Sequence, residues 1–375
     1  MKNIIIVGAG GIGKACALIL LQHDKSNDLA ISLADIDYTQ CEKAIQWINN
    51  GLENPRKLEC IDLSKTQPEK WNPEGEIILD CTPGIHAEEI AKIALRNNMH
   101  YANLTEHVTA TNAILKLVKD NSKCFALQTG LAPGFVNVWT KKLISDFKTE
   151  LHESKIKTVK MRVGALSPTV SSPSFYAFTW SPIGVSTEYL NKAIILKNKE
   201  IISVEALSGR EDIIINGIHY EAEHTSGGAS DLPQYYANEV DNLDYKTIRY
   251  PGHFDWVKKV KSQIGKNITP ELLKSKMIRE IPFQETDRVI IYTSITGLQS
   301  NKTILEKCKV IEIRPITYNS IEMAAIQRTT AASLAQTAML LLTNKYSGCM
   351  LQSQFPTEKF LGGEIIKEHY GTFTS

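Results

Sequence analysis

The chain has 375 residues, 42 Lys and Arg against 41 Asp and Glu, and a formal net charge of +1. This length is more than one ordinary hydrophobic core organises, so we expect two domains. Because the charge is balanced and no basic stretch alternates with aromatic residues, the sequence does not indicate nucleic-acid binding. No apolar run reaches the roughly 18 residues of a membrane span, and the nearest, residues 331–342, contains polar side chains.

The spacing of the cysteines and histidines does not indicate a disulfide-rich or a metal-binding protein. Seven cysteines are scattered without a C-x-x-C pair, which is typical of reduced thiols. The N-terminus enters an apolar strand at once and does not look like a signal peptide, so we expect a cytoplasmic protein. The nine histidines show no H-E-x-x-H motif or clustered spacing, so the sequence does not predict a metal site.

The first predicted elements form a nucleotide-binding motif. An apolar run over residues 4–7 ends in the sequence GAGGIG at positions 8–13, and a helix-compatible segment over 14–21 follows. This order predicts a strand, a tight turn and a helix whose N-terminus binds a pyrophosphate, with glycines for the turn, the close backbone approach and the helix packing. The predicted contacts to the dinucleotide are made by Gly8, Gly10, Gly11, Ile12 and Gly13.

The acid after the second strand predicts which dinucleotide binds. An apolar strand over residues 29–34 ends in Asp35, and no Lys or Arg follows before Lys43. A carboxylate accepts hydrogen bonds from ribose hydroxyls and repels the 2′-phosphate of NADP, so the sequence predicts NAD. S-Adenosylmethionine and a domain that has lost its cofactor are the alternatives.

Strands and helices alternate up to about residue 128, which predicts a parallel sheet covered on both faces. Asp62 ends a strand and is a candidate to face the adenine of the cofactor. The alternative is that Asp62 belongs to a solvated turn. Cys81, Thr82 and Pro83 follow the next strand, where such a sheet opens onto its ligand. The helices are expected over residues 40–49, 86–97 and 109–121, and the further strands over 58–63, 77–79, 101–104 and 124–128.

The pattern changes near residues 129–134. The dipeptide Asn216-Gly217 between two β-branched runs predicts a hairpin, and the middle of the chain is typical of an α+β domain with a mostly antiparallel sheet. An Ala-rich helix over 324–342 follows, which we expect to pack on the first domain. The expected strands of the middle part are 157–163, 193–196, 200–204, 212–215, 245–248 and 288–296.

Several loop-like stretches carry residues that suit an amino-acid substrate. Arg249 has the planar guanidinium that binds a carboxylate, and His253, beyond a Pro-Gly turn, exchanges a proton near neutral pH. A surface ion pair and a structural histidine are the alternative interpretations. The other candidates, for which helix caps or surface loops are the alternatives, are Thr105, Glu106, Glu188, Asp231 and Tyr250.

Together these segments resemble the saccharopine dehydrogenase family, and within it the lysine 6-dehydrogenase-like members. The resemblance rests on residues 8–13, 80–84, 130–134, 180–189, 225–228 and above all on YKTIRYPGH at 245–253, in this order. It implies an α/β fold with a Rossmann doubly wound domain at 1–130, completed by 324–375. It also implies an inserted α+β domain at 131–323 for substrate binding, and a homodimer or higher oligomer built through that domain.

The resemblance also implies hydride transfer between a nicotinamide cofactor and a C–N bond of a lysine-derived amino acid. Fungal saccharopine reductases carry an Asp where this chain has Ala132, which favours lysine over saccharopine as the substrate. We expect Arg249 to hold the substrate carboxylate and His253 to act as the base. The expected ligands of the ammonium group, or relays of its proton, are Thr105, Glu106, Glu188 and Asp231.

Three other functions stay open at this point. The first is saccharopine dehydrogenase itself, for which a second Arg in the pocket is expected. The second is a polyamine-handling member, which needs no carboxylate clamp. The third is a protein that senses NADH without turnover.

Overall fold

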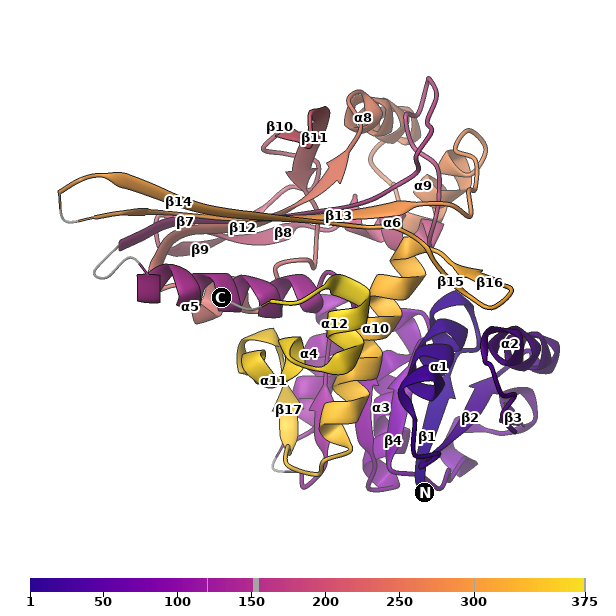
Figure 1. Cartoon of the computed structure of the whole chain (residues 1–375). Helices are drawn as coiled ribbons and strands as arrows, with labels where there is room; N and C mark the ends of the chain where they lie inside the picture. The colour runs from indigo at the N-terminus through magenta and orange to yellow at the C-terminus, as the bar shows by residue number, and fades with distance from the viewer. Residues whose placement is uncertain (120, 151–154, 300, 374–375) are drawn as a thin grey trace. The chain divides into compact units, whose positions relative to one another are not determined.

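The computed structural model describes residues 1–119, 121–150, 155–299 and 301–373. Its contacts divide the chain into two compact units (Figure 1). The first unit comprises Met1–Val138, Ile316–Met323 and the segment from Gln327 onward, and the second comprises Trp139–Pro315 and Ala324–Ile326. Helices α5 (Phe135–Glu150) and α10 (Ala325–Leu341) have residues in both units.

The first unit contains a parallel sheet of seven strands in the order β17-β6-β5-β4-β1-β2-β3 (Figure 1). The strand order reverses between β1 and β4, as in a doubly wound fold, and ligands of such sheets bind at this point. The strands are β1 (Lys2–Val7), β2 (Leu29–Asp35), β3 (Glu59–Asp62), β4 (Ile77–Asp80), β5 (His100–Asn103), β6 (Cys124–Ala126) and β17 (Gly348–Met350).

Both faces of this sheet are buried, because successive side chains of a strand point to opposite faces. Ile5 and Val7 of β1 pack in one apolar cluster with helices α3 and α4, while Ile4 and Ile6 point the other way and are fully buried. The predicted α/β doubly wound sheet is therefore confirmed. The helices of this unit are α1 (Gly11–His23), α2 (Tyr38–Gly51), α3 (Ala87–Arg96), α4 (Val108–Leu117), α11 (Thr357–Leu361) and α12 (Glu364–Tyr370).

Three details of this unit differ from the expected elements: the end of one helix, an added strand and an added hairpin. Helix α4 ends at Leu117, before the expected end at residue 121, and position 120 lies outside the described residues. The N–H of Gly348 bonds to the carbonyls of Asn121 and Lys123, which aligns β17 with β6. The hairpin of β15 (Ile316–Tyr318) and β16 (Ile321–Met323) also groups with this unit, where Tyr318 donates a hydrogen bond of 2.6 Å to Glu368.

The second unit is built on a mixed sheet of eight strands. The path runs β10-β11-β12-β7-β13-β14, with β8 pairing to β12 and β9. Only the β7–β12 pair in the described sheet is parallel, so the expected mostly antiparallel sheet is confirmed. The strands are β7 (Lys155–Leu166), β8 (Ala193–Lys197), β9 (Glu200–Val204), β10 (Glu211–Ile215), β11 (Ile218–His224), β12 (Val240–Arg249), β13 (Arg288–Leu298) and β14 (Ile304–Ile313).

The predicted hairpin at Asn216-Gly217 joins β10 and β11. Ile215 pairs with Ile218, and both turn residues have positive φ, 51° and 80°, as a two-residue type I′ turn requires. One apolar cluster packs helices α6, α8 and α9 together. The helices of this unit are α6 (Pro182–Glu188), α7 (Leu232–Tyr235), α8 (His253–Ile264) and α9 (Pro270–Met277).

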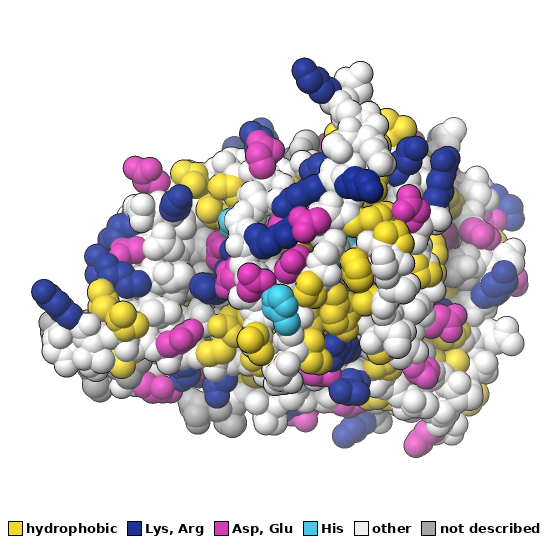
Figure 2. Space-filling model, turned by 90° about the horizontal axis from the view of Figure 1, so that it is seen from above, with side chains coloured by type: hydrophobic (Ala, Val, Ile, Leu, Met, Phe, Trp, Pro, Cys, Tyr) yellow, Lys and Arg dark blue, Asp and Glu magenta, His cyan; other side chains and the backbone are white. Residues whose placement is uncertain are grey.

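The surface offers no large area of one charge on the face drawn in Figure 2. Lys and Arg side chains there are interspersed with Asp and Glu, and apolar side chains lie between them. None of the helices in the described residues combines the length and the apolar character needed to cross a membrane.

Candidate functional site

The glycine loop after β1 has the shape that a bound pyrophosphate needs. Gly8 has φ +95°, and a Cβ there would lie 2.9 Å from the backbone of Cys81, so a side chain is excluded. A Cβ on Gly13 would lie 1.9 Å from the Gly8 carbonyl oxygen. A Cβ on Gly10 would meet nothing within 4 Å, so this stretch of backbone is open to a ligand at the start of α1.

The loop after β4 lies directly beside the glycine loop. The Cys81 N–H donates to the Val7 carbonyl at 2.8 Å. Asp80, only 2% exposed, accepts hydrogen bonds from the Thr82 N–H at 2.9 Å and from the Thr82 hydroxyl at 2.6 Å, while Tyr101 donates to its other oxygen at 2.7 Å. These bonds shape the loop that carries Cys81, Thr82 and Pro83.

Asp35 lies at the end of β2 and touches the same loop. One carboxylate oxygen accepts from the Ala9 N–H at 2.7 Å, and the other accepts from the Asp37 N–H at 3.0 Å. The acid is therefore placed within the dinucleotide motif. Gln327 of α10 also approaches the loop, because its amide nitrogen would lie 2.9 Å from a Cβ on Gly11.

Two other predicted cofactor residues have local roles in the structure. Asp62 caps a short turn by accepting from the Ser64 N–H at 3.0 Å, and it pairs with Lys65 at 2.7 Å. These contacts match the alternative interpretation of Asp62 as a residue of a solvated turn. Cys81 is half-buried, and burial raises the pKa of its thiol well above the ordinary value, so the sulfur is neutral.

Thr105 and Glu106 follow β5 at the same edge of the sheet. A Cβ on Gly84 would lie 2.0 Å from the Thr105 hydroxyl, so the loops after β4 and β5 are in close contact. Glu106 lies beside His107, with an N···O distance of 3.9 Å, and burial raises the pKa of its carboxyl group. This carboxyl group therefore holds a proton at higher pH than an exposed glutamate does.

In the second unit, a turn brings Arg249 and His253 together. Arg249 ends β12 and His253 begins α8, and Gly252 between them has φ +93°. This left-handed conformation favours glycine, and a Cβ there would lie 3.0 Å from the Phe175 ring. Both candidate side chains therefore belong to regular elements, and both are buried, at 1% and 0% exposure.

A series of hydrogen bonds joins these two side chains. The Arg249 Nε–H donates to the Tyr189 hydroxyl at 2.7 Å, and this hydroxyl lies 3.0 Å from His253 Nε2. His253 Nδ1 lies 2.7 Å from the Ser174 carbonyl oxygen. Burial, assisted by the Arg249 charge, lowers the pKa of His253 to about 3, so the ring is neutral and both nitrogens have protein partners.

Further side chains surround the Arg249 guanidinium. Its Cζ lies 4.6 Å from the centre of the Tyr176 ring, and the buried Tyr176 hydroxyl has no hydrogen-bond partner among the residues that the structure describes. Glu188, 9% exposed, ends α6 close enough for its charge to act on Arg249. Burial alone would lower the pKa of the guanidinium, but the nearby phenols and this carboxylate outweigh it and raise the pKa.

The two remaining substrate candidates, Tyr250 and Asp231, have contacts with other side chains. Tyr250 directly follows the end of β12, and its hydroxyl donates to the Ser167 carbonyl at 3.0 Å and accepts from Arg288 at 2.9 Å. Asp231 precedes α7, where its charge acts on Lys141. Burial lowers the pKa of Lys141 to about 8, and Asp231 opposes this effect.

The sequence did not single out Tyr176, Ser174 or Gln327. A buried tyrosine in a cluster and a tyrosine in an apolar core have the same local sequence, so no motif marks Tyr176. Ser174 contributes only its backbone carbonyl, which any residue has. Gln327 reaches the glycine loop from a helix more than three hundred positions away.

One group of potential metal ligands lies in the described residues, at His23, Glu368 and His369. Arg328 Nε–H donates to His369 Nδ1 at 3.3 Å, so the ring proton is on Nε2. Nε2 would have to lose this proton to bind a metal, and the Arg328 guanidinium lies beside Nδ1 of the same ring. The arrangement therefore does not favour a cation.

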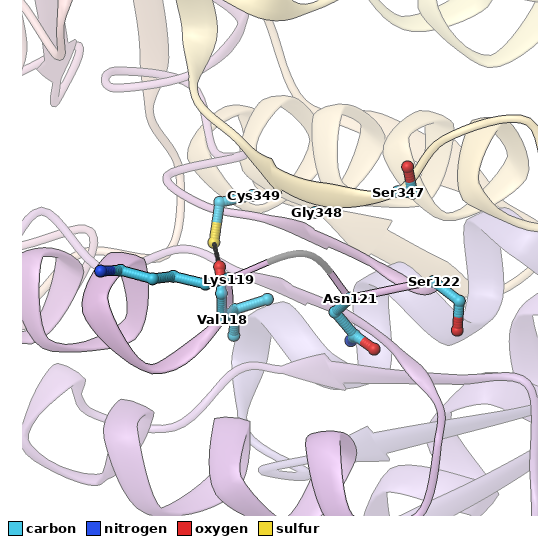
Figure 3. A pocket seen from close by; sticks show the side chains of 7 residues that line it. All are labelled: Val118, Lys119, Asn121, Ser122, Ser347, Gly348 and Cys349. Atoms are coloured by element: carbon cyan, nitrogen blue, oxygen red, sulfur yellow. Dashed lines mark hydrogen bonds between the residues drawn. The ribbon is translucent and has the colours of Figure 1, made fainter.

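A separate cavity of about 660 Å³ opens at the start of β6 and β17 (Figure 3). The Cys349 thiol contacts the Val118 carbonyl there at 3.6 Å. The cavity lies at the amino ends of these strands, whereas the dinucleotide loops follow carboxyl ends, so it is distinct from the cofactor site. It is lined by Val118, Lys119, Asn121, Ser122, Ser347, Gly348 and Cys349.

Similar solved structures include two enzymes whose chains are matched almost throughout. Apo saccharopine dehydrogenase (L-Glu forming) from Saccharomyces cerevisiae has a TM-score of 0.75 at 15% identity, covering 99% of this chain and 98% of that chain. Homospermidine synthase from Legionella pneumophila, in complex with NAD, has a TM-score of 0.68 at 14% identity, covering 99% and 90%. At these identities the likeness shows a shared fold.

Two family models match successive parts of the chain. The saccharopine dehydrogenase NADP binding domain matches residues 4–126, which contain the glycine loop and Asp35. The saccharopine dehydrogenase C-terminal domain matches residues 130–368, which contain the Arg249 cluster. The chain therefore belongs to the saccharopine dehydrogenase family and is an oxidoreductase that binds a nicotinamide cofactor.

Proposed function

We propose that this protein oxidises the C–N bond of lysine or a lysine-derived amino acid with NAD. The observation that carries the proposal is the buried Arg249 guanidinium with the Glu188 carboxylate close to it. A cation and an anion side by side complement the carboxylate and the ammonium group of an amino acid. The family resemblance to lysine 6-dehydrogenase-like members supports lysine as the particular substrate.

The choice of NAD over NADP rests on Asp35. Its carboxylate is fixed against the glycine loop by the Ala9 N–H at 2.7 Å. A 2′-phosphate near this acid would be repelled, and the next cation along the chain is Lys43. Gly8, Gly10, Gly11, Ile12 and Gly13 are the proposed pyrophosphate contacts, with Asp62, Cys81, Thr82 and Pro83 as further cofactor contacts.

The proposed carboxylate clamp is Arg249. Within the described residues, two of its five N–H groups are used, one by Tyr189 and one by the Ile248 carbonyl at 2.9 Å. The remaining groups can form the paired hydrogen bonds that a carboxylate accepts. The Tyr176 ring beside the guanidinium carries a hydroxyl group that can add a further donor.

The reaction also needs a group that accepts a proton from the substrate amine. A bound nicotinamide would supply a hydride acceptor for the carbon that carries the deprotonated amine. The substrate would then be an iminium, which reacts with water. We propose Glu106 as the proton acceptor, because burial brings its pKa toward the working pH, with Thr105 beside it. Asp231 and Tyr250 remain proposed substrate contacts.

Three further properties belong to the proposal. We place the protein in the cytoplasm, because its cysteines within the described residues are all free thiols. We propose a homodimer or higher oligomer built through the inserted domain, as the family resemblance implies. The inserted domain at 131–323 is proposed to bind the substrate, and the segments 1–130 and 324–375 to bind the cofactor.

A substrate panel tests the proposal directly. The purified protein is mixed with NAD or NADP and with lysine, saccharopine, ornithine or the diamine cadaverine, and absorbance of the reduced nicotinamide is followed. We expect reduction with NAD and lysine. Reduction with saccharopine alone, or with diamines alone, would replace the proposed substrate, and tight NADH binding without any turnover would favour a sensor.

The Arg249→Lys variant tests the clamp. A lysine cannot form the paired hydrogen bonds of a guanidinium, so we expect KM for lysine to rise roughly 10- to 100-fold, as the loss of a charged hydrogen bond predicts. Arg210→Lys is the matched control, because Arg210 pairs with Glu223 and Asp255 instead. An unchanged KM in Arg249→Lys would remove the clamp from the proposal.

A further inference from the structure

The hydrogen bonds around Arg249 can be followed with their direction. A guanidinium only donates hydrogen bonds, so the Tyr189 hydroxyl accepts from the Arg249 Nε–H. A carbonyl only accepts, so His253 Nδ1 carries the proton that points to Ser174. His253 Nε2 is then an acceptor in the neutral ring, and the Tyr189 hydroxyl donates to it.

We propose that Tyr189 and His253 are positioning residues that hold the Arg249 guanidinium through this chain of hydrogen bonds. The inference rests on the proposed function, in which Arg249 binds the substrate carboxylate. It gives His253 a different role from the base expected from the sequence. The His253 ring accepts the proton of the Tyr189 hydroxyl, so that a lone pair of the Tyr189 oxygen faces Arg249.

The surroundings explain why such a chain is needed. Arg249 and Tyr189 are buried, at 1% and 0% exposure, so water does not orient the guanidinium. The centre of the Tyr176 ring lies 4.6 Å from the Arg249 Cζ, and the Ile248 carbonyl accepts from one Nη1 proton. Without an acceptor for its Nε–H, the buried cation would lose a charged hydrogen bond and its orientation.

A base role for His253 conflicts with the same contacts. A second proton on the ring would have to sit on Nε2, where the Tyr189 O–H already points. It would also place two cations in one buried cluster, next to Arg249. The neutral ring therefore serves as a fixed acceptor.

The Tyr189→Phe variant tests the first link. It keeps the ring and removes only the hydroxyl, so we expect KM for lysine to rise about tenfold or more, with kcat changed much less. KM for NAD stays unchanged. Tyr220→Phe is the matched control, because it removes a similar bond from Arg288, of 2.7 Å, in the same sheet but outside the cluster.

Two substitutions of His253 separate positioning from base catalysis. His253→Gln retains an acceptor oxygen for Tyr189, so we expect KM for lysine near the wild-type value, whereas His253→Phe raises it as Tyr189→Phe does. Combining Tyr189→Phe with His253→Phe adds little, because either change breaks the same chain. A base role predicts instead that both His253 variants lose kcat with KM unchanged, and that result would overturn the inference.

A measurement without turnover keeps the inference independent of the assay. In ¹⁵N NMR spectra of the full chain, we expect His253 as the neutral Nδ1–H tautomer across about pH 5 to 9. Titration near pH 6.5, the ordinary value, or the Nε2–H tautomer would overturn it. If wild-type protein oxidises lysine but Tyr189→Phe keeps its KM, the inference fails while the proposed function stands; an inactive wild type contradicts the proposed function alone.

Discussion

Asp35 combines a structural contact with a proposed role in the choice of cofactor. It holds the Ala9 N–H of the glycine loop with one oxygen and the Asp37 N–H with the other. The sequence predicted the acid because it directly follows an apolar strand at the spacing of a dinucleotide motif. The contact to Ala9 adds that the same carboxylate stiffens the loop.

The Asp35→Asn variant is expected to shift cofactor preference. The amide still accepts from Ala9, but it removes the negative charge, so we expect KM for NAD to rise roughly tenfold and the preference over NADP to shrink. Initial rates with both cofactors measure this ratio. Asp37→Asn is the control, because Asp37 caps helix α2 through the Gln40 N–H at 3.1 Å. An unchanged ratio would contradict the assignment.

At the scale of single elements, a buried charge network joins three strands of the second unit. Arg162 of β7, 1% exposed, contacts Asp244 at 2.9 Å and Glu211 at 2.8 Å. Lys246 contacts the same Glu211 at 3.0 Å. Opposite charges thus connect β7, β10 and β12 on one face of the sheet, while the Arg249 cluster occupies the other side of β12.

Removing the central cation is expected to destabilise this sheet strongly. Arg162→Met removes the buried cation that Asp244 and Glu211 share and leaves them only their less buried partners, so we expect the free energy of unfolding to fall by about 3 kcal/mol. Urea unfolding measures this change. Lys192→Met, in an exposed pair with Glu205, is the control, and we expect no measurable change there. An equal loss in both variants would contradict a special role of the network.

The same network predicts how stability depends on pH. Burial alone would raise the pKa of Glu211, but Arg162 and its neighbouring lysines outweigh it and lower the pKa to about 2, from 4.5. The pKa of Asp244 is likewise held below its ordinary value of 3.8. A lowered acid pKa contributes stability above the unfolded value and loses it as pH falls.

We therefore expect the urea midpoint to drop between about pH 4.5 and 2. The Glu211→Gln variant should show a shallower drop in this window, since one of the titrating groups is gone. Equal pH dependence in the two proteins would show that other carboxylates cause the drop.

At the scale of the whole molecule, each unit carries one set of the proposed functional residues. The glycine loop, Asp35 and the loops after β4 and β5 belong to the first unit, and the Arg249 cluster belongs to the second. A ligand that binds only the folded state stabilises it by about 2.7 kcal/mol at a hundredfold excess over Kd. We therefore expect the cofactor to stabilise the first unit against unfolding and the substrate to stabilise the second.

Hydrogen exchange tests this division. We expect NADH to slow exchange in peptides that contain residues 8–13 and 81–84, and to raise the unfolding temperature. Lysine should slow exchange around residues 245–253. Protection by NADH confined to the second unit would contradict the assignment of the cofactor site, and Asp35→Asn should need more NADH for the same protection.

The sequence by itself determined the alternating strands and helices up to about residue 128 and much of the second unit. Glycine spacing, apolar strands and an acid at a strand end are local patterns, and each forces a local geometry, as the φ of +95° at Gly8 illustrates. The Asn216-Gly217 turn and the Pro-Gly turn before His253 could be predicted from the sequence for the same reason. Arg249 and His253 were recognisable because the chain places them four positions apart.

Only the tertiary structure decided how these residues interact. Tyr189 and Tyr176 reach Arg249 from distant segments, and their approach depends on the packing of α6 and α8 rather than on spacing. Tyr250 shows the converse, because it is adjacent to Arg249 in the sequence yet its hydroxyl bonds to Ser167 and Arg288. Burial and partners, which sequence spacing does not encode, determine that His253 is neutral and which atom each side chain contacts.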